Sequence, residues 1–76
     1  MKIQILGTGC AKCNNLADAA IQAANELGLE YEIEKVTDMM RFADFGVMIT
    51  PALAIDGEVK VAGRVPDIEE LKRLLA

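Results

Sequence analysis

Tryptophan and histidine are both absent from this 76-residue sequence, and only 4% of its residues are aromatic. Hydrophobic residues still make up 53% of the chain, so its interior must be built from Ile, Leu, Val, Ala and Met. A chain of this length is close to the lower limit at which one hydrophobic core suffices for folding. We therefore expect one small domain that spans residues 1–76.

Cysteine is scarce as well, and the chain has only Cys10 and Cys13. Two cysteines are too few for a scaffold held together by disulfides. Without histidine, they do not close a four-ligand zinc site unless two chains combine. In a chain that looks intracellular, a CxxC pair is more typical of redox chemistry or of metal binding.

Basic residues and long apolar runs are also few. The 8 Lys and Arg against 12 Asp and Glu give a formal net charge of −4, which disfavours nucleic acid or an anionic membrane as a partner. No apolar run approaches the roughly 20 residues of a membrane span. The first residues, 1–3, lead directly into a strand-like run, so we expect no signal peptide and a cytoplasmic protein.

The two cysteines lie in the stretch GTGCAKC, residues 7–13, between an apolar run at 3–6 and a helical pattern. The apolar face of that helix is predicted to hold Cys13, Leu16, Ala17, Ala20, Ala24 and Leu27. Because the N–H groups of a first helical turn favour negative charge, Cys10 should ionise more readily than an ordinary cysteine. Cys13 follows about one turn later on the same face, where two sulfurs can close and reopen a small disulfide.

The rest of the chain alternates between strand and helix patterns. We predict strands at residues 2–6, 30–36, 52–55 and 58–62, and helices from about 11 to 27, from 39 to about 45 and from Pro66 onward. Thr37-Asp38 can cap the second helix, and Asp56-Gly57 is a strong signal for a tight hairpin. The order β-α-β-α-β-β-α predicts an α/β fold, with helices on both faces of a four-stranded mixed sheet.

Two stretches allow more than one interpretation. The glutamates at 30, 32 and 34 alternate with apolar residues, which favours the solvated face of an edge strand over an acidic docking surface. Met39 and Met40, with Phe42, fit either an adaptable partner surface or core filling, and their helical spacing favours core filling.

The CxxC after the first strand, the later Ile49-Thr50-Pro51 and the Asp-Gly hairpin, in this order, resemble the thioredoxin superfamily. The likeness is strongest to its smallest thioredoxin-like and glutaredoxin-like members, of the redox-active disulfide type, and it covers essentially the whole chain. It implies that Cys10 is the attacking nucleophile and Cys13 the buried resolving cysteine. It also implies a cis peptide bond before Pro51, facing the disulfide. The substrate-binding residues that we carry over from it are Thr50, Pro51, Gly9, Ala11, Lys12 and Gly63.

The sequence departs from the thioredoxin pattern at several positions. Gly9 replaces the tryptophan before the first cysteine, and Ala11-Lys12 replaces the Gly-Pro pair between the cysteines. No acid matches the buried one behind the second cysteine, since the first strand offers only Gln4. Lys12 either favours the thiolate through its charge or points to water.

The favoured interpretation is a thiol–disulfide oxidoreductase, a protein-disulfide reductase or electron carrier that works as a monomer. It needs no cofactor beyond the Cys10–Cys13 disulfide and no metal. Its expected partners are protein disulfides and a dithiol or flavoprotein reductase. The alternative is a Cu(I)-type soft-metal carrier that uses the same two cysteines. Such ferredoxin-like domains end on a strand, whereas this chain is predicted to end on a helix.

Glutathione is expected to be a poor electron donor. Glutaredoxin-type sites usually have a basic residue shortly before the CxxC, an aromatic within it and a glycine-acid pair at the last helix. At the matching places this sequence has residues 7–9 (GTG), residues 11–12 (AK), and Gly63-Arg64 followed by Val65, so these glutaredoxin features are missing. Lys12 and Arg64 offer only isolated positive charges, so glutathione binding must offset its ordering cost with few fixed contacts.

Overall fold

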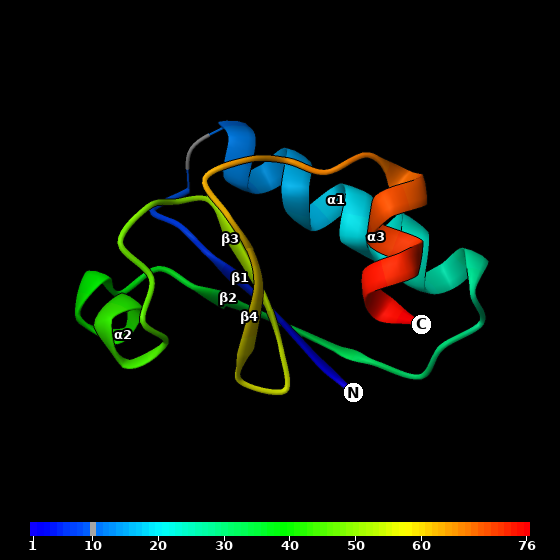
Figure 1. Cartoon of the computed structure of the whole chain (residues 1–76), viewed down its shortest axis with the longest axis horizontal. Coiled ribbons are helices and arrows are strands. Elements are labelled where there is room, and N and C mark those ends of the chain that lie inside the picture. Colours follow the sequence, from blue (N-terminus) through cyan, green and yellow to red (C-terminus); the bar gives the residue numbers. More distant parts are fainter. Residues whose placement is uncertain (10) are drawn as a thin grey trace.

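The computed structural model describes residues 1–9 and 11–76. Its strands are β1 (Lys2–Leu6), β2 (Glu32–Val36), β3 (Ala52–Ile55) and β4 (Glu58–Ala62), and its helices are α1 (Ala11–Glu26), α2 (Met39–Asp44) and α3 (Ile68–Leu75). The predicted order β-α-β-α-β-β-α and the mixed four-stranded sheet are confirmed (Figure 1).

The strands lie in the order β2-β1-β3-β4, with β1 parallel to β2 and antiparallel to β3, and with β3 antiparallel to β4. In the register, Leu6 pairs with Val36 on one side and with Ala52 on the other, and Ala52 also pairs with Ala62. The chain segments just beyond these four residues therefore gather at one end of the sheet. We call this the Gly7 end, after the residue that follows β1.

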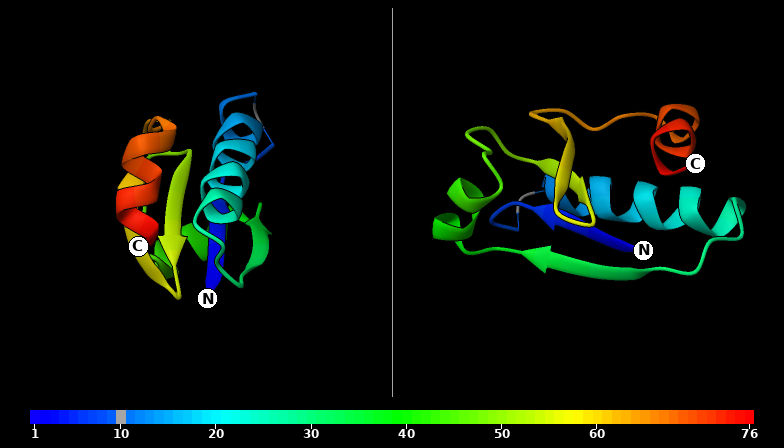
Figure 2. Two further views of the ribbon diagram at one scale, coloured as in Figure 1. Left: turned by 90° about the vertical axis from the view of Figure 1, so that its right-hand side faces the viewer. Right: turned by 60° about the horizontal axis from the view of Figure 1, so that its bottom comes forward.

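The two faces of the sheet are covered differently. Helices α1 and α3 lie side by side on one face (Figure 2). Ile3, Ile5 and Leu53 belong to the larger hydrophobic cluster on that face. On the other face, α2 contributes Phe42 to a smaller cluster with Leu6 and other sheet residues. Helix α2 lies at the end of the molecule away from α3 (Figures 1 and 2). Alternate residues of each strand supply the two clusters, because successive side chains of a strand point to opposite faces.

Strand β2 begins at Glu32, two residues later than predicted. Tyr31 lies before the strand, and its hydroxyl donates a hydrogen bond to Asn25 Oδ1 at 2.8 Å. This contact holds the aromatic ring near the end of α1. The alternating pattern of the sequence therefore begins before the first residue of β2 that pairs with β1. The predicted edge position of this strand is confirmed by the strand order.

The core-filling interpretation of Met39 and Met40 is wrong, because 70% and 82% of their surfaces are exposed. Only Phe42 of that segment is buried, since α2 is a short helix that presents one residue to the sheet. Along α1, Leu27 is exposed, contrary to prediction, because the helix ends at Glu26. Ala23 is buried on that helix instead.

Helix and turn signals in the sequence have the predicted local roles, with one shift. The Asp38 side chain caps α2 by accepting a hydrogen bond from the Met40 amide at 2.9 Å. Asp67 caps α3, which begins at Ile68 and not at Pro66. Asp56 and Gly57 both have positive φ angles, 51° and 88°, as a tight hairpin turn requires. Within residues 1–9 and 11–76, no helix is long and apolar enough to cross a membrane.

Candidate active site

The turn between β1 and α1 carries the cysteine motif. Gly7 is buried, and its amide continues the parallel ladder by donating to the Val36 carbonyl at 3.0 Å. Thr8 and Gly9 are exposed, and Gly9 has a φ of 89°, a conformation that glycine adopts easily. Cys10, the predicted nucleophile, lies outside the described residues.

Cys13 lies in the first turns of α1 with only 5% of its surface exposed. Its sulfur packs directly on the backbone of Gly7, since a Cβ at that position would stand 2.1 Å from Cys13 Sγ and 3.1 Å from its Cβ. Any side chain at residue 7 would therefore displace the cysteine. The sequence predicts Gly7 only as part of a sharp turn. The structure gives a second reason for glycine at this position, the close approach of the strand and the helix, which the sequence pattern does not reveal.

A small cavity of about 20 Å³ lies beside Cys13. It is lined by Ile5, Gly7, Gly9, Cys13, Asn14, Lys35 and Thr37. A water molecule needs about 10–15 Å³ of such space, so the cavity has room for one. Lys35 carries the only charge among these lining residues. The alternation of β2 was the available signal for this residue, because Lys35 shares the α1 face with Ile33.

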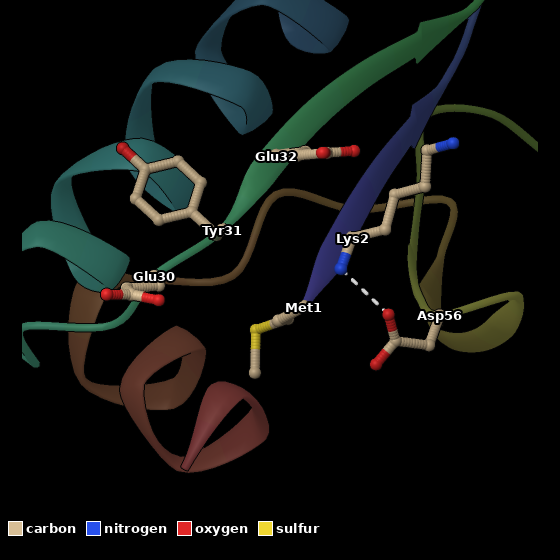
Figure 3. Close-up of a pocket in the computed structure, with 6 residues that line it drawn as sticks. All are labelled: Met1, Lys2, Glu30, Tyr31, Glu32 and Asp56. Atoms are coloured by element: carbon tan, nitrogen blue, oxygen red, sulfur yellow. Dashed lines mark hydrogen bonds between the residues drawn. The ribbon is translucent and has the colours of Figure 1, made fainter.

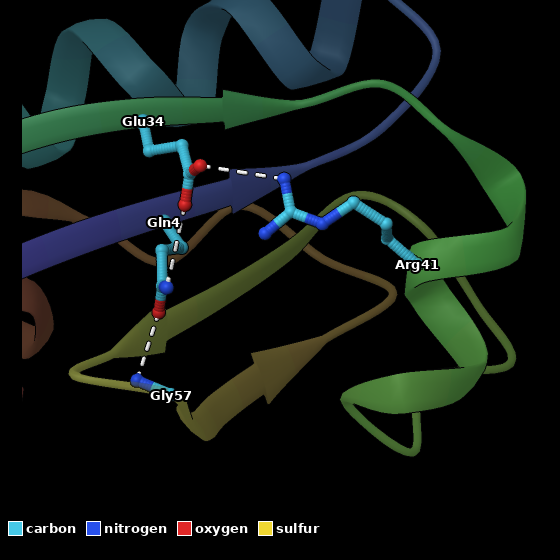
Figure 4. A network of polar contacts seen from close by, with 4 residues as sticks. All are labelled: Gln4, Glu34, Arg41 and Gly57. Carbon is cyan, nitrogen blue, oxygen red and sulfur yellow. Dashed lines mark hydrogen bonds and ion pairs between the residues drawn. The ribbon is translucent and has the colours of Figure 1, made fainter.

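Gln4 is not part of this cavity, although the sequence offers it where thioredoxins have a buried acid. It points to the other face of the sheet (Figure 4). There its amide oxygen accepts from the Gly57 amide at 2.8 Å, and its amide nitrogen donates to Glu34 at 3.4 Å. The Arg41 guanidinium, 3.3 Å from Glu34, holds the pKa of that carboxyl below its usual value by donating a hydrogen bond to it. Gln4 thus ties an edge strand to the hairpin.

The Thr50–Pro51 segment lies at the Gly7 end of the sheet, just before β3. Its peptide bond is cis, the geometry that the resemblance implies. Thr50 is exposed and Pro51 is buried, and the Pro51 carbonyl accepts a hydrogen bond from the Gly63 amide at 2.7 Å. Gly63 has a φ of 84°, and a Cβ there would stand 2.9 Å from Ile49 Cγ2.

The register brings most of the predicted site residues to this one end. Gly9 and Cys13 follow β1, the Thr50–Pro51 segment precedes β3, and Gly63 follows β4. Ala11 and Lys12 open α1 and are exposed to solvent. The structure therefore gathers these residues at the Gly7 end of the sheet, where α1 begins.

The opposite end of the sheet has a larger, polar hollow of about 420 Å³. It is lined by Met1, Lys2, Glu30, Tyr31, Glu32 and Asp56 (Figure 3). The Lys2 amide there donates to Asp56 Oδ1 at 2.7 Å. Since Lys2 and Leu6 are the two ends of β1, the whole strand, about 13 Å at 3.3 Å per residue, separates this hollow from the cysteine motif.

Comparison with known proteins assigns the family. Residues 1–76 match the family described as the thioredoxin domain. The chain belongs to the thioredoxin family. The predicted resemblance is confirmed, and the family has thiol–disulfide oxidoreductase activity as its shared kind of chemistry.

Two archaeal thioredoxins illustrate how closely the chain follows this family. It is 47% identical to a thioredoxin of Methanothermobacter thermautotrophicus strain Delta H, over 100% of this chain and 99% of that protein. It is 42% identical to a thioredoxin of Methanocaldococcus jannaschii, over 96% of this chain and 84% of the relative. The thioredoxin likeness therefore extends along the whole chain and is not confined to the CxxC.

Proposed function

We propose that this chain is a dithiol carrier that reduces disulfides of other proteins, with Cys10 as the nucleophile and Cys13 as the resolving cysteine. The observation that carries the proposal is the position of Cys13. It is buried at the start of α1, packed on Gly7, and at the same end of the sheet as Thr50–Pro51. A thiol at a helix start is favoured as the thiolate, which is the reacting form.

The reaction consists of two exchanges. The Cys10 thiolate attacks one sulfur of the target disulfide, the target S–S bond breaks, and its other sulfur leaves as a thiolate that takes up a proton. The Cys13 thiolate then attacks the Cys10 sulfur of the mixed disulfide and releases the second target thiol. Two electrons pass to the target, and the carrier ends with a Cys10–Cys13 disulfide.

Thr50 and Pro51 form the platform for the target in this proposal, together with Gly9, Ala11, Lys12 and Gly63. The segment just before β3 is exposed at Thr50, so an extended peptide has access to its backbone. The Gly63–Pro51 hydrogen bond fixes the segment from behind. Pairing through backbone groups suits a carrier with several targets, because it places few demands on target side chains.

Lys35 assists the resolving step. Among the described residues that line the cavity beside Cys13 none is a carboxylate, and Lys35, which is exposed to solvent on β2, is the one cation. An ammonium group close to a thiol favours the charged thiolate form. One water in the cavity would link the departing proton to solvent.

A dithiol or a flavoprotein reductase returns the carrier to its reduced form, and glutathione is a poor donor. Arg64, one of the two isolated charges near the site, binds Glu70 with its guanidinium at 2.8 Å. The Arg64 guanidinium is therefore already paired with a carboxylate, which makes it a weak binding group for the carboxylates of glutathione. A reducing compartment such as the cytoplasm suits a carrier of this kind.

The test is a redox titration of the purified protein with metal content assayed in parallel. We expect a reversible two-electron midpoint in the thioredoxin-to-glutaredoxin range, roughly −200 to −270 mV. We expect Cys13→Ser to accumulate mixed disulfides with target proteins, and Cys10→Ser to trap almost none. Tight stoichiometric Cu(I) that survives strong chelators, without a disulfide couple, would instead support the metal-carrier alternative.

The donor assignment has its own measurement. The Cys10–Cys13 disulfide is reduced with a dithiol, with a flavoprotein thioredoxin reductase and with glutathione at matched driving force. Slow, non-saturable reduction by glutathione is expected. Fast, saturable reduction by glutathione would move the protein to the glutaredoxin type.

A further inference from the structure

All four methionines of the chain, at positions 1, 39, 40 and 48, lie on its surface. Met48 is 98% exposed, and even Met1, the least exposed of the four, shows 42% of its surface to solvent. Methionine is usually one of the more buried residue types, yet none of these four belongs to either hydrophobic cluster of the core. The thioether sulfurs of the chain are therefore open to reagents in solvent.

Few other side chains of this chain compete with the methionines for an oxidant. Tryptophan and histidine, which strong oxidants also attack, are absent. Cys10 and Cys13 are the only cysteines, and once they have closed the disulfide of the proposed function, no thiolate is left to react with a peroxide. In that state the methionines are the side chains that a hydroperoxide oxidises first.

Met48 combines the greatest exposure of the four with a place beside the peptide platform. It lies in the loop between α2 and β3, two residues before Thr50. In the same loop Ile49 approaches Gly63, and the Gly63 amide donates to the Pro51 carbonyl at 2.7 Å. A chemical change at Met48 is therefore made next to a segment that is held against the end of β4.

We propose that Met48 is a modification site at which a hydroperoxide regulates the carrier. The thioether sulfur attacks one peroxide oxygen, the O–O bond breaks, and an S=O bond forms. The proton of the transferred oxygen passes to the leaving oxygen, so the peroxide ends as water or an alcohol. The sulfur loses two electrons and the peroxide gains them. The modification itself does not depend on the proposed function, whereas its effect on disulfide exchange rests on it.

The sulfoxide makes this loop polar where it was apolar. The thioether of methionine is a weak hydrogen-bond acceptor, whereas the oxygen of a sulfoxide is polar and hydrated. A protein target that pairs with the backbone at Thr50 and Pro51 comes up against the loop and must displace this water. A small disulfide reaches the cysteines without covering Met48. The sulfoxide should therefore slow exchange with protein disulfides about fivefold and leave exchange with a small disulfide unchanged.

Met40 provides a control within the same molecule. It is 82% exposed on α2, so a peroxide should reach its sulfur nearly as well as that of Met48. Met48 lines an apolar groove of about 510 Å³ between α2 and the following loop, and Met40 does not line it. The two methionines are thus expected to differ in the effect of their sulfoxides and not in their reactivity.

The test treats the disulfide form of the protein with hydrogen peroxide and follows each methionine by peptide mass spectrometry. Oxidation should follow exposure, with Met48 modified about twice as fast as Met1. The treated protein is then reduced with a dithiol, and its exchange with insulin and with hydroxyethyl disulfide is measured. Exchange with insulin alone should be slower, and methionine sulfoxide reductases for both sulfoxide epimers should restore it. Oxidised Met48 with unchanged insulin exchange would overturn the proposal.

Two variants locate the effect. Peroxide treatment of Met48→Leu should leave its insulin exchange close to that of the untreated variant, because leucine keeps an apolar side chain without an oxidisable sulfur. Met40→Leu should stay as sensitive to peroxide as the wild type. Equal sensitivity of Met48→Leu and the wild type would overturn the proposal. The oxidation rates need no exchange activity, so slow oxidation of Met48 beside fast oxidation of Met40 overturns the modification site, whereas failure to reduce either disulfide overturns the proposed function.

Discussion

The two faces of the sheet differ in how completely their apolar side chains are buried. On the α1 and α3 face, twelve of the described residues form one buried cluster, with several side chains that expose no surface at all. On the α2 face the buried cluster has six of the described residues, and methionines beside it stand open to solvent. Cys13, which is buried on α1, packs on Gly7 beside the first face. The second face leaves apolar surface available next to the segment that precedes β3.

Under the proposed function, this difference separates the positioning of the chemistry from the recognition of partners. Fixing a resolving thiol requires close packing, because displacement by even a methyl group disturbs the geometry. Recognition of varied partners benefits from side chains that move and repack. The four predictions that follow test how far the two faces act independently, from the largest expected effect to the smallest.

Gly7→Ala is expected to be the most damaging change, since the new methyl group would stand 2.1 Å from Cys13 Sγ. We expect a loss of about 3 kcal/mol in the free energy of unfolding, measured by urea denaturation, together with strongly slowed disulfide exchange. Combining it with Cys13→Ala should recover part of the lost stability, because the clashing sulfur is gone. Gly9→Ala is the control, as a Cβ there meets nothing within 4 Å and costs backbone strain alone. Equal losses at Gly7 and Gly9 would contradict the contact.

Gly63→Ala tests the link between the end of β4 and the platform. The φ of 84° and the approach to Ile49 should together cost about 2 kcal/mol and push the Ile49–Pro51 segment outward. Exchange with a protein disulfide should then slow more than exchange with a small disulfide, as rate measurements on both will show. Gly28→Ala, with a φ of 68° and no atoms nearby, controls for strain. The same slowing in both variants would remove the special role of Gly63.

Lys35→Met is expected to act on the pH dependence of the resolving step. If the Lys35 charge favours the Cys13 thiolate as proposed, its removal should move the pH profile of the rate toward higher pH. Release of target from the mixed disulfide would slow about threefold at neutral pH, as followed by stopped flow. Lys35→Arg should keep the original profile, because it keeps the charge. Loss of stability without a shift of the profile would indicate a packing role only.

The charge carriers around this cavity are few, which makes the Lys35 test specific. On β2, Glu34 faces the opposite side of the sheet and binds Gln4 and Arg41. On α1, Lys12 and Asp18 are exposed to solvent. Strand β3 carries no charged residue, and β1 has only Lys2, at the far end of the strand. Lys35 is also exposed, but it lies among the described residues that line the cavity and Lys12 does not, so Lys12→Met should shift the profile less than Lys35→Met does.

Acid titration should weaken both faces slightly. A hydrogen bond from Lys72 lowers the pKa of Glu26, which joins α1 to α3, and one from Arg41 lowers the pKa of Glu34, which joins β2 to α2. Carboxyls with lowered pKa values stabilise the fold above their unfolded value of 4.5 and lose this contribution as the pH falls through the folded value. Both pairs are exposed, so the effect is small.

Glu26→Gln and Glu34→Gln should each lower the urea midpoint at pH 7 and have no effect near pH 2, where the wild-type carboxyls are protonated. Glu30→Gln serves as the control, because Glu30 has no described ion pair. A midpoint change that stays the same at both pH values would show that the side-chain shape matters and the charge does not.

The sequence predicts most of the fold because its local signals agree with one another. Asp56-Gly57 marks the hairpin, Asp38 marks a helix start, and the apolar run of β1 marks a buried strand. Each of these signals depends on residues a few positions apart. Even the errors are local, since Leu27 lies one residue beyond the end of its helix.

The site could be predicted only in part, because its contacts join distant segments. The CxxC indicates where chemistry takes place, but the contact of Gly7 with Cys13 depends on how closely the strand and helix pack. Lys35 reaches the cavity through the pairing of β2 with β1, and the sequence does not reveal that Ile5 is its partner. The exposure of Met39 and Met40 does not follow from the sequence for a related reason, since helical spacing does not say which side of a short helix faces the sheet.

The placement of the two chain ends has a practical consequence. Met1 lies at the end of β1 that adjoins the polar hollow, one strand length from Gly7. The last helix is joined to the final residue of α1 by the Lys72–Glu26 ion pair, and α1 is about 24 Å long. Both ends of the chain therefore point away from the cysteine motif (Figure 1). A purification tag, a surface anchor or a fused reporter can be attached at either end without covering the cysteine motif.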